Sequence, residues 1–165
     1  MDLGYLKIKI DIKAEYEDFK KKYHYKRKEL KKEEIKKVFD GFKDFFKSDG
    51  HFKFKENDHT ITAEYKDYGI TLDVDIYKNT DSPDFTVLGS IKTYEGELFD
   101  FTAEGISNKE VPLQPAFADE QERMIHDTRY FKDFLLNGDV TYSFQYAIKG
   151  REEVYMSMQE MMLAL

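Results

Sequence analysis

The fold is decided by the stretch ITAEYKDYGITLDVDI, residues 61–76. Apolar residues alternate with polar ones in both of its halves, at residues 61–65 and 70–76. Alternation with a period of two is typical of a strand that buries one face. The turn between the halves is too short for a crossover helix, so the two strands are predicted to pair as an antiparallel hairpin.

Three more segments of the middle third show the same alternation, at residues 52–54, 85–91 and 99–103. The connections at 56–58, 78–83 and 95–96 are rich in Asn, Asp, Gly and Ser, which favour turns. Short turns between consecutive strands predict a sheet that is antiparallel throughout this part of the chain.

The two ends of the chain contain segments with the strand period of two and segments with the helical spacing of three or four residues. Leu6, Ile8, Ile10 and Ile12 alternate with polar residues and predict a further strand at 6–12. Apolar residues three or four apart predict helices at 14–25, 35–46, 117–136 and 154–165, the second of them ended by Gly50 in a left-handed cap. A last strand is predicted at 140–148, and residues 105–116 are predicted to form a loop.

These elements follow one another in the order β-α-α-β-β-β-β-β-α-β-α. Because strands and helices do not alternate regularly, a parallel doubly wound sheet is not expected. We expect one α+β domain over residues 1–165, with a largely antiparallel, twisted sheet of six to seven strands and helices packed on one face. The order of elements resembles that of helix-grip folds of the START and plant-allergen kind, from which the helix at 117–136 and the strand at 140–148 depart.

Composition and charge narrow the class of protein. The chain has no cysteine, no long apolar run and a start without a basic region followed by an apolar one, so we expect a cytoplasmic protein without a membrane span. The net charge is −7. Residues 1–48 carry 15 basic and 10 acidic residues, whereas the remainder carries 11 and 23. This acidic balance argues against nucleic acid as a partner, although basic residues and tyrosines are concentrated at 20–32.

Signatures of catalysis and of cofactor binding are missing from the sequence. Glycine-rich phosphate loops, a nucleophile elbow and histidine pairs at metal-ligand spacing do not occur. We therefore expect no cofactor, no metal site and no catalytic residue. The alternative is a carboxylate site on one face of the sheet, formed by Glu64, Asp73 and Asp75.

The leading interpretation is a non-enzymatic module that occludes a basic surface of a protein partner, as immunity proteins, antitoxins and anti-defence inhibitors do. It rests on the small size and on an acidic, tyrosine-rich two thirds of the chain. The predicted partner-binding residues surround the helix at 117–136: Asp119, Glu120, Glu122, Asp127, Tyr130 and Asp133.

The alternative interpretation is a cup of helix-grip type that binds a small apolar ligand. Methionine packs adaptably, and four of the six methionines lie in the last ten residues. The predicted lining residues are Met158, Met161, Met162, Phe99 and Phe101. A strand edge left exposed can also pair two copies of the chain into a homodimer.

Overall fold

The computed structural model describes residues 1–81, 84–107, 116, 119–137 and 142–165. Within these ranges the chain forms four helices and a seven-stranded antiparallel sheet, which confirms the predicted α+β class. The chain divides into two compact units, one of Met1–Glu29 with Ser107–Thr141 and one of Leu30–Ile106 with Tyr142–Leu165. The expected single domain stays a prediction.

The first helix, α1 (Leu3–Lys47), corrects the prediction for the N-terminal third. The strand predicted at 6–12 is wrong, and the helices predicted at 14–25 and 35–46 are parts of α1. Residues 5–40 contain neither glycine nor proline, and a nucleated helix extends at little cost through such a stretch. Residues two apart lie about 200° apart around a helix, so the alternation becomes two opposite apolar stripes rather than one buried face.

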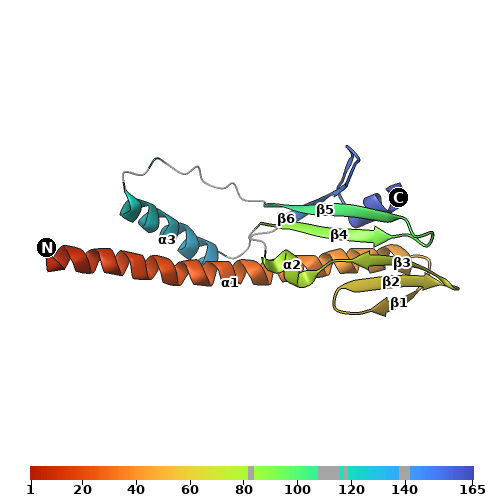
Figure 1. Cartoon of the computed structure of the whole chain (residues 1–165), viewed down its shortest axis with the longest axis horizontal. Coiled ribbons are helices and arrows are strands. Elements are labelled where there is room, and N and C mark those ends of the chain that lie inside the picture. The colour runs from red at the N-terminus through yellow and green to blue at the C-terminus, as the bar shows by residue number, and fades with distance from the viewer. Residues whose placement is uncertain (82–83, 108–115, 117–118, 138–141) are drawn as a thin grey trace. The chain divides into compact units, whose positions relative to one another are not determined.

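In the first unit, α3 (Glu120–Leu136) packs beside the N-terminal part of α1 (Figure 1). Tyr23 of α1 stacks on Phe131 with ring centres 4.7 Å apart and meets the edge of Phe134 at 4.9 Å. Lys132 forms an ion pair with Glu15. The helix starts after Asp119, whose carboxylate caps it by accepting a hydrogen bond from the backbone N–H of Glu122 at 2.9 Å.

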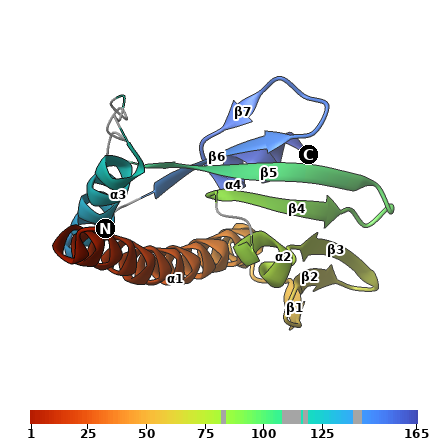
Figure 2. The ribbon, with the colours of Figure 1, turned by 60° about the vertical axis from the view of Figure 1, so that its left-hand side comes forward.

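The second unit is built on the sheet. Its strands are neighbours in the order in which they follow along the chain (Figure 2). They are β1 (Lys53–Glu56), β2 (Thr60–Tyr65), β3 (Tyr68–Asp73), β4 (Thr86–Lys92), β5 (Leu98–Ser107), β6 (Tyr142–Ile148) and β7 (Val154–Tyr155). The hairpins predicted from the alternation at 52–103 are confirmed by the pairing of β1 with β2, β2 with β3, and β4 with β5.

One face of the sheet forms the core of this unit. The C-terminal part of α1 and the short helix α4 (Met158–Ala164) both pack on it, as predicted. Its largest fully buried side chains come from both helices, from β3 and β4, and from the residue after β3: Ile35, Val38, Phe42, Leu72, Val74, Val87, Ile91 and Met161. Gly50 follows the end of α1 with a φ of 81°, which confirms the predicted left-handed cap.

Two boundaries differ from the prediction. The strand predicted to reach Ile76 ends at Asp73, and α2 (Ile76–Asp81) replaces most of the turn predicted at 78–83. The C-terminal helix predicted from 154 begins at Met158, after the two residues of β7. In both places side chains cap the helix start, because Asp75 accepts the N–H of Lys78 and Ser157 accepts the N–H of Glu160.

The remaining predictions concern the segments before α3 and β6. The predicted helix at 117–136 and strand at 140–148 are confirmed where the structure describes them. Of the loop predicted at 105–116, residues 105–107 belong to β5, and residues 108–115 lie outside the described residues. No described helix is long and apolar enough to cross a bilayer.

Candidate functional site

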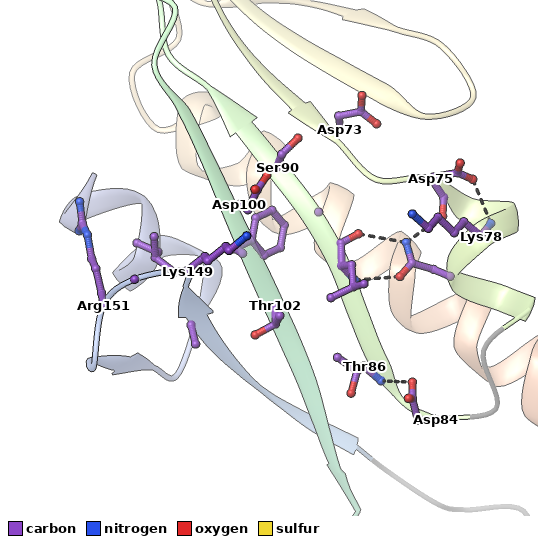
Figure 3. Close-up of a pocket in the computed structure, with 17 residues that line it drawn as sticks. Asp73, Asp75, Lys78, Asp84, Thr86, Ser90, Asp100, Thr102, Lys149 and Arg151 are labelled. Carbon is purple, nitrogen blue, oxygen red and sulfur yellow. Dashed lines mark hydrogen bonds between the residues drawn. The ribbon is translucent and has the colours of Figure 1, made fainter.

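A trough of about 900 Å³ lies on the face of the sheet that points away from the core. In β4 the side chains of Val87 and Ile91 are buried in the core, so those of Leu88 and Ser90 point to the opposite face of the sheet. The same alternation in β5 buries Phe101 and turns Asp100 outward. Side chains and backbone from β3, α2, β4, β5 and β6 line this trough (Figure 3).

The middle of the trough is a row of three polar side chains. Asp73 of β3 is paired in register with Ser90 of β4, and Ser90 is paired with Asp100 of β5. Neighbouring strands are about 4.8 Å apart, so the backbones of the two aspartates are about 10 Å apart. Figure 3 shows Asp73, Ser90 and Asp100 one after another across the three strands. The row therefore presents one carboxylate on each side of a hydroxyl group.

Neither carboxylate of this row has a partner within the described chain. Asp73 and Asp100 are exposed, and no described side chain or backbone N–H donates to their carboxylate oxygens. Asp75 and Asp84, which also line the trough, are engaged: Asp75 caps α2, and Asp84 lies 3.6 Å from the buried ammonium of Lys31. Asp73 and Asp100 are thus available to a cationic ligand.

Three cations line the trough. Lys78 of α2 lies on the side of Asp75, and Arg151 lies on the opposite side beyond β5 (Figure 3). Lys149 is the direct neighbour of Asp100, because its backbone N–H donates to the backbone oxygen of Asp100 at 2.9 Å, and its side chain extends across β5 (Figure 3). The guanidinium of Arg151 donates to the backbone oxygen of Ala164 at 2.7 Å and lies 5.5 Å from the ring centre of Phe99. Arg151 therefore holds the C-terminal segment, whereas Lys149 lies beside Asp100 without an ion pair between them among the described contacts.

The residues predicted to bind a partner are dispersed around α3. Asp119 caps the helix, Glu120 lies 3.6 Å from Arg123, and Asp133 accepts a hydrogen bond from Asn137. Of the others, Glu122 is exposed, Asp127 lies 3.5 Å from the ring of His126, and Tyr130 packs its edge on Tyr23 at 5.8 Å. Arg123 and Arg129 are exposed on the same helix, so its surface carries both signs of charge.

The residues predicted to line a ligand cup belong to the core. Met158, Met161 and Met162 are 2%, 0% and 7% exposed and pack with the sheet and α1. Phe99 is half-buried beside them, and Phe101 is 2% exposed. Phe101 also contributes to the floor of the trough. The cup stays a prediction.

The predicted carboxylate site does not assemble. Asp73 is paired with Thr60, whereas Glu64 is paired with Gly69 farther along the hairpin and forms an ion pair with Lys55 at 3.0 Å. Among the described residues no group of three or more potential ligands could hold a metal ion.

The histidines at the first hairpin do not face each other. His51 lies near Tyr65, with ring centres 6.3 Å apart, and His59 lies near Tyr77 at 5.5 Å. The Nδ1 atom of His59 accepts the backbone N–H of Ile76 at 3.3 Å. His59 therefore supports the start of α2.

The basic concentration at 20–32 lies on α1. Several cations there already lie over aromatic rings of the chain, Lys20 at 5.5 Å from Tyr16 and Arg27 at 5.5 Å from Tyr23. Because Tyr23 is buried against α3, its ring is not available to stack with a base.

Ser90, Asp100, Lys149 and Arg151 were not singled out by the sequence reasoning. Each belongs to a strand, or follows one, whose alternation was recognised, but the pairing that brings Ser90, Asp100 and Lys149 side by side is a property of the assembled sheet. Comparisons of the chain with models of known protein families, with curated proteins and with solved structures find no match.

Proposed function

We propose that this protein is a non-enzymatic binding module that captures a basic segment of a protein partner in the trough. The observation that carries the proposal is the row of Asp73, Ser90 and Asp100, whose two carboxylates are exposed and form no ion pair among the described residues. Carboxylates arranged in this way attract a positively charged partner and fix its register.

The trough supports this function better than the surface of α3 does. On α3 most acidic side chains have a partner on the same helix, and exposed arginines lie among them. The lining of the trough also includes the apolar residues Leu88 and Ala147 and the hydroxyl-bearing residues Ser90 and Thr102. A surface of this kind suits the aliphatic stems of lysine and arginine, whose charged ends then reach the aspartates.

A polar small ligand is the second candidate. The volume of about 900 Å³ falls within the range of small-molecule sites. Native mass spectrometry of the purified protein distinguishes the two: an adduct of a few hundred daltons supports a retained small ligand, whereas its absence leaves the protein partner as the proposal. We place this function in the cytoplasm, because a chain without cysteine is compatible with a reducing compartment.

The test uses a basic peptide as the probe. Acetylated pentalysine amide is titrated into the 15N-labelled protein, and the backbone amide shifts are followed by NMR. We expect saturable shifts centred on Asp73, Ser90 and Asp100, and an affinity that falls as salt is added. Pentaglutamate amide is the control and is expected to cause no shifts in the trough.

Two matched charge reversals separate the trough from α3. Asp73→Lys with Asp100→Lys is expected to weaken the pentalysine affinity at least about tenfold, which corresponds to about 1.4 kcal/mol. Glu122→Lys with Asp133→Lys changes the net charge equally and is expected to leave the affinity within about twofold. A loss in the α3 variant alone would place the site on α3, and equal losses in both would show that the peptide responds only to net charge.

A further inference from the structure

A second, smaller pocket lies at the tips of two hairpins, on the core face of the sheet. Tyr65 follows Ile61 and Ala63 by alternation in β2, so its side chain is on the same face as these buried residues. The pocket has a volume of about 230 Å³. Its lining includes the rings of Phe52, Tyr65, Tyr68 and Tyr94.

The aromatic rings of this pocket form two inclined pairs. The rings of Tyr68 and Tyr94 are 5.8 Å apart and almost perpendicular at 85°, and those of Phe52 and Tyr65 are 5.6 Å apart at 46°. The three tyrosines are exposed by 44%, 62% and 59% in chain order. Aromatic surface of this extent, at the point where α1 has already ended, is a feature of binding sites rather than of a core.

The charges around the pocket favour a cation. Asp67 lies in the two-residue turn that joins Tyr65 to Tyr68, and the hydroxyl of Tyr94 donates to the carboxylate of Glu95 at 3.1 Å. That hydrogen bond raises the pKa of Tyr94, as a neighbouring carboxylate must. The ammonium of Lys66 already lies 5.4 Å from the centre of the Tyr65 ring. The chain itself therefore already places a cation at one ring of this pocket.

We propose that the hairpin-tip pocket binds one cationic side chain, lysine or arginine, presented by a protein partner. Its volume is below that of sites for drug-sized ligands and suits a single side chain. The aliphatic stem contacts the apolar lining, the charged end lies against the tyrosine faces, and Glu95, which accepts the hydroxyl of Tyr94, supplies the opposite charge. This site is on the opposite face from the trough, and its existence does not depend on the function proposed for the trough.

The test compares three small probes that differ in one property each. Nα-acetyl-arginine amide carries the cation, Nα-acetyl-citrulline amide is its neutral isostere, and Nα-acetyl-norleucine amide is neutral and apolar. NMR titration of the 15N-labelled protein is expected to show saturable shifts at Tyr65, Tyr68 and Tyr94 with the arginine probe. Citrulline is expected to bind about three- to fivefold more weakly, the ratio that a cation–π contact at an exposed site gives.

Three variants localise the interaction. Tyr68→Leu with Tyr94→Leu keeps apolar surface but removes two rings, and is expected to reduce arginine binding to the level of citrulline. Lys66→Asn removes the internal cation at a position whose φ is 55°, which asparagine tolerates, and is expected to strengthen arginine binding. Tyr77→Leu, at an exposed tyrosine of α2, is the matched control and is expected to change nothing. Thermal unfolding of each variant verifies that it is folded.

Several outcomes would overturn the proposal. Equal binding of arginine and citrulline would show that charge is not recognised, and tighter binding of norleucine would show an apolar site. The absence of chemical shift changes with all three probes would show that the pocket binds none of these side chains. A concentration-dependent doubling of the mass that Tyr68→Leu with Tyr94→Leu abolishes would show that a second copy of the chain covers the pocket instead.

Discussion

The side-chain amide of Asn79 takes the place of a missing strand beside Leu88. Its Oδ1 accepts the backbone N–H of Leu88 at 2.8 Å, and its Nδ2 donates to the backbone oxygen of Leu88 at 3.0 Å. Strand β3 pairs with β4 only from Ser90 to Lys92, so at Leu88 the backbone of β4 would otherwise lack these bonds. Asn79 thereby fixes α2 against the sheet and with it one wall of the trough.

We expect Asn79→Ala to lower the free energy of unfolding by about 1–3 kcal/mol, because it leaves backbone groups of Leu88 without partners. Asn79→Asp retains the acceptor but loses the donor, so its effect is expected to be of similar size. Urea denaturation followed by circular dichroism measures both. Lys78→Ala, at an exposed neighbour, serves as the control, and an equal loss in this control would show that α2 is destabilised generally.

Gly89 is expected to tolerate no side chain. A Cβ atom at this position would lie 2.6 Å from the Cζ atom of Phe101 and 3.0 Å from a methyl group of Val74. Gly89→Ala is therefore expected to lower the free energy of unfolding by about 1–3 kcal/mol through overpacking. Thermal and urea unfolding of the purified variant provide the measurement.

A double-mutant cycle identifies the clash as the cause. Phe101→Leu makes room beside Gly89, so the alanine is expected to cost less in the Phe101→Leu background than in the wild type. Additive losses in the double variant would contradict a direct contact between the two positions.

Because of Tyr146, the free energy of unfolding is expected to depend on pH above about pH 10. Burial, with a smaller contribution from the carboxylate of Glu34, raises the pKa of Tyr146 from 10.0 to about 12. Because the folded-state pKa lies above the unfolded one, the stabilisation is complete below pH 10 and is lost as the pH rises through 12. Urea unfolding at pH 8, 10, 11 and 12 is expected to show this loss, which for Tyr146 amounts to about 2 kcal/mol.

The control for this prediction is Tyr146→Phe, which keeps the buried ring and removes the ionisable group. The difference in unfolding free energy between variant and wild type is expected to be constant up to pH 10 and to shift in favour of the variant above it. A difference that is the same at pH 8 and pH 12 would mean that Tyr146 ionises as readily in the folded protein as in the unfolded one.

The start of α4 is expected to depend on Ser157. Its hydroxyl accepts the N–H of Glu160 at 3.1 Å, and the carboxylate of Glu160 accepts the N–H of Met156 at 2.9 Å. Ser157→Ala is expected to lower the free energy of unfolding by about 1 kcal/mol, whereas Ser157→Asp, which also caps a helix, is expected to restore most of it. Equal losses in both variants, measured by urea unfolding, would contradict the capping role.

The candidate sites were only partly predictable. Alternation in the sequence identified Asp73 as an outward-facing residue of a strand, but it also suggested Glu64 as its neighbour. Register decided otherwise, because Glu64 is opposite Gly69 and the row through Asp73 continues to Ser90 and Asp100. A shift of register changes which side chains meet across a sheet without changing the local pattern of any strand.

The sequence by itself determined the α+β class, the consecutive hairpins between residues 52 and 103, and the apolar stripes of α3 and the C-terminal part of α1. These follow from the spacing of apolar residues within one segment, which is a local property. The tertiary structure alone decided that residues 6–12 continue a helix, that α2 replaces a turn, and that Asp73 and Asp100 share a row. Each of these depends on contacts or pairing between segments distant in the chain, or on the cooperative extension of a neighbouring helix, and no short window of sequence contains that information.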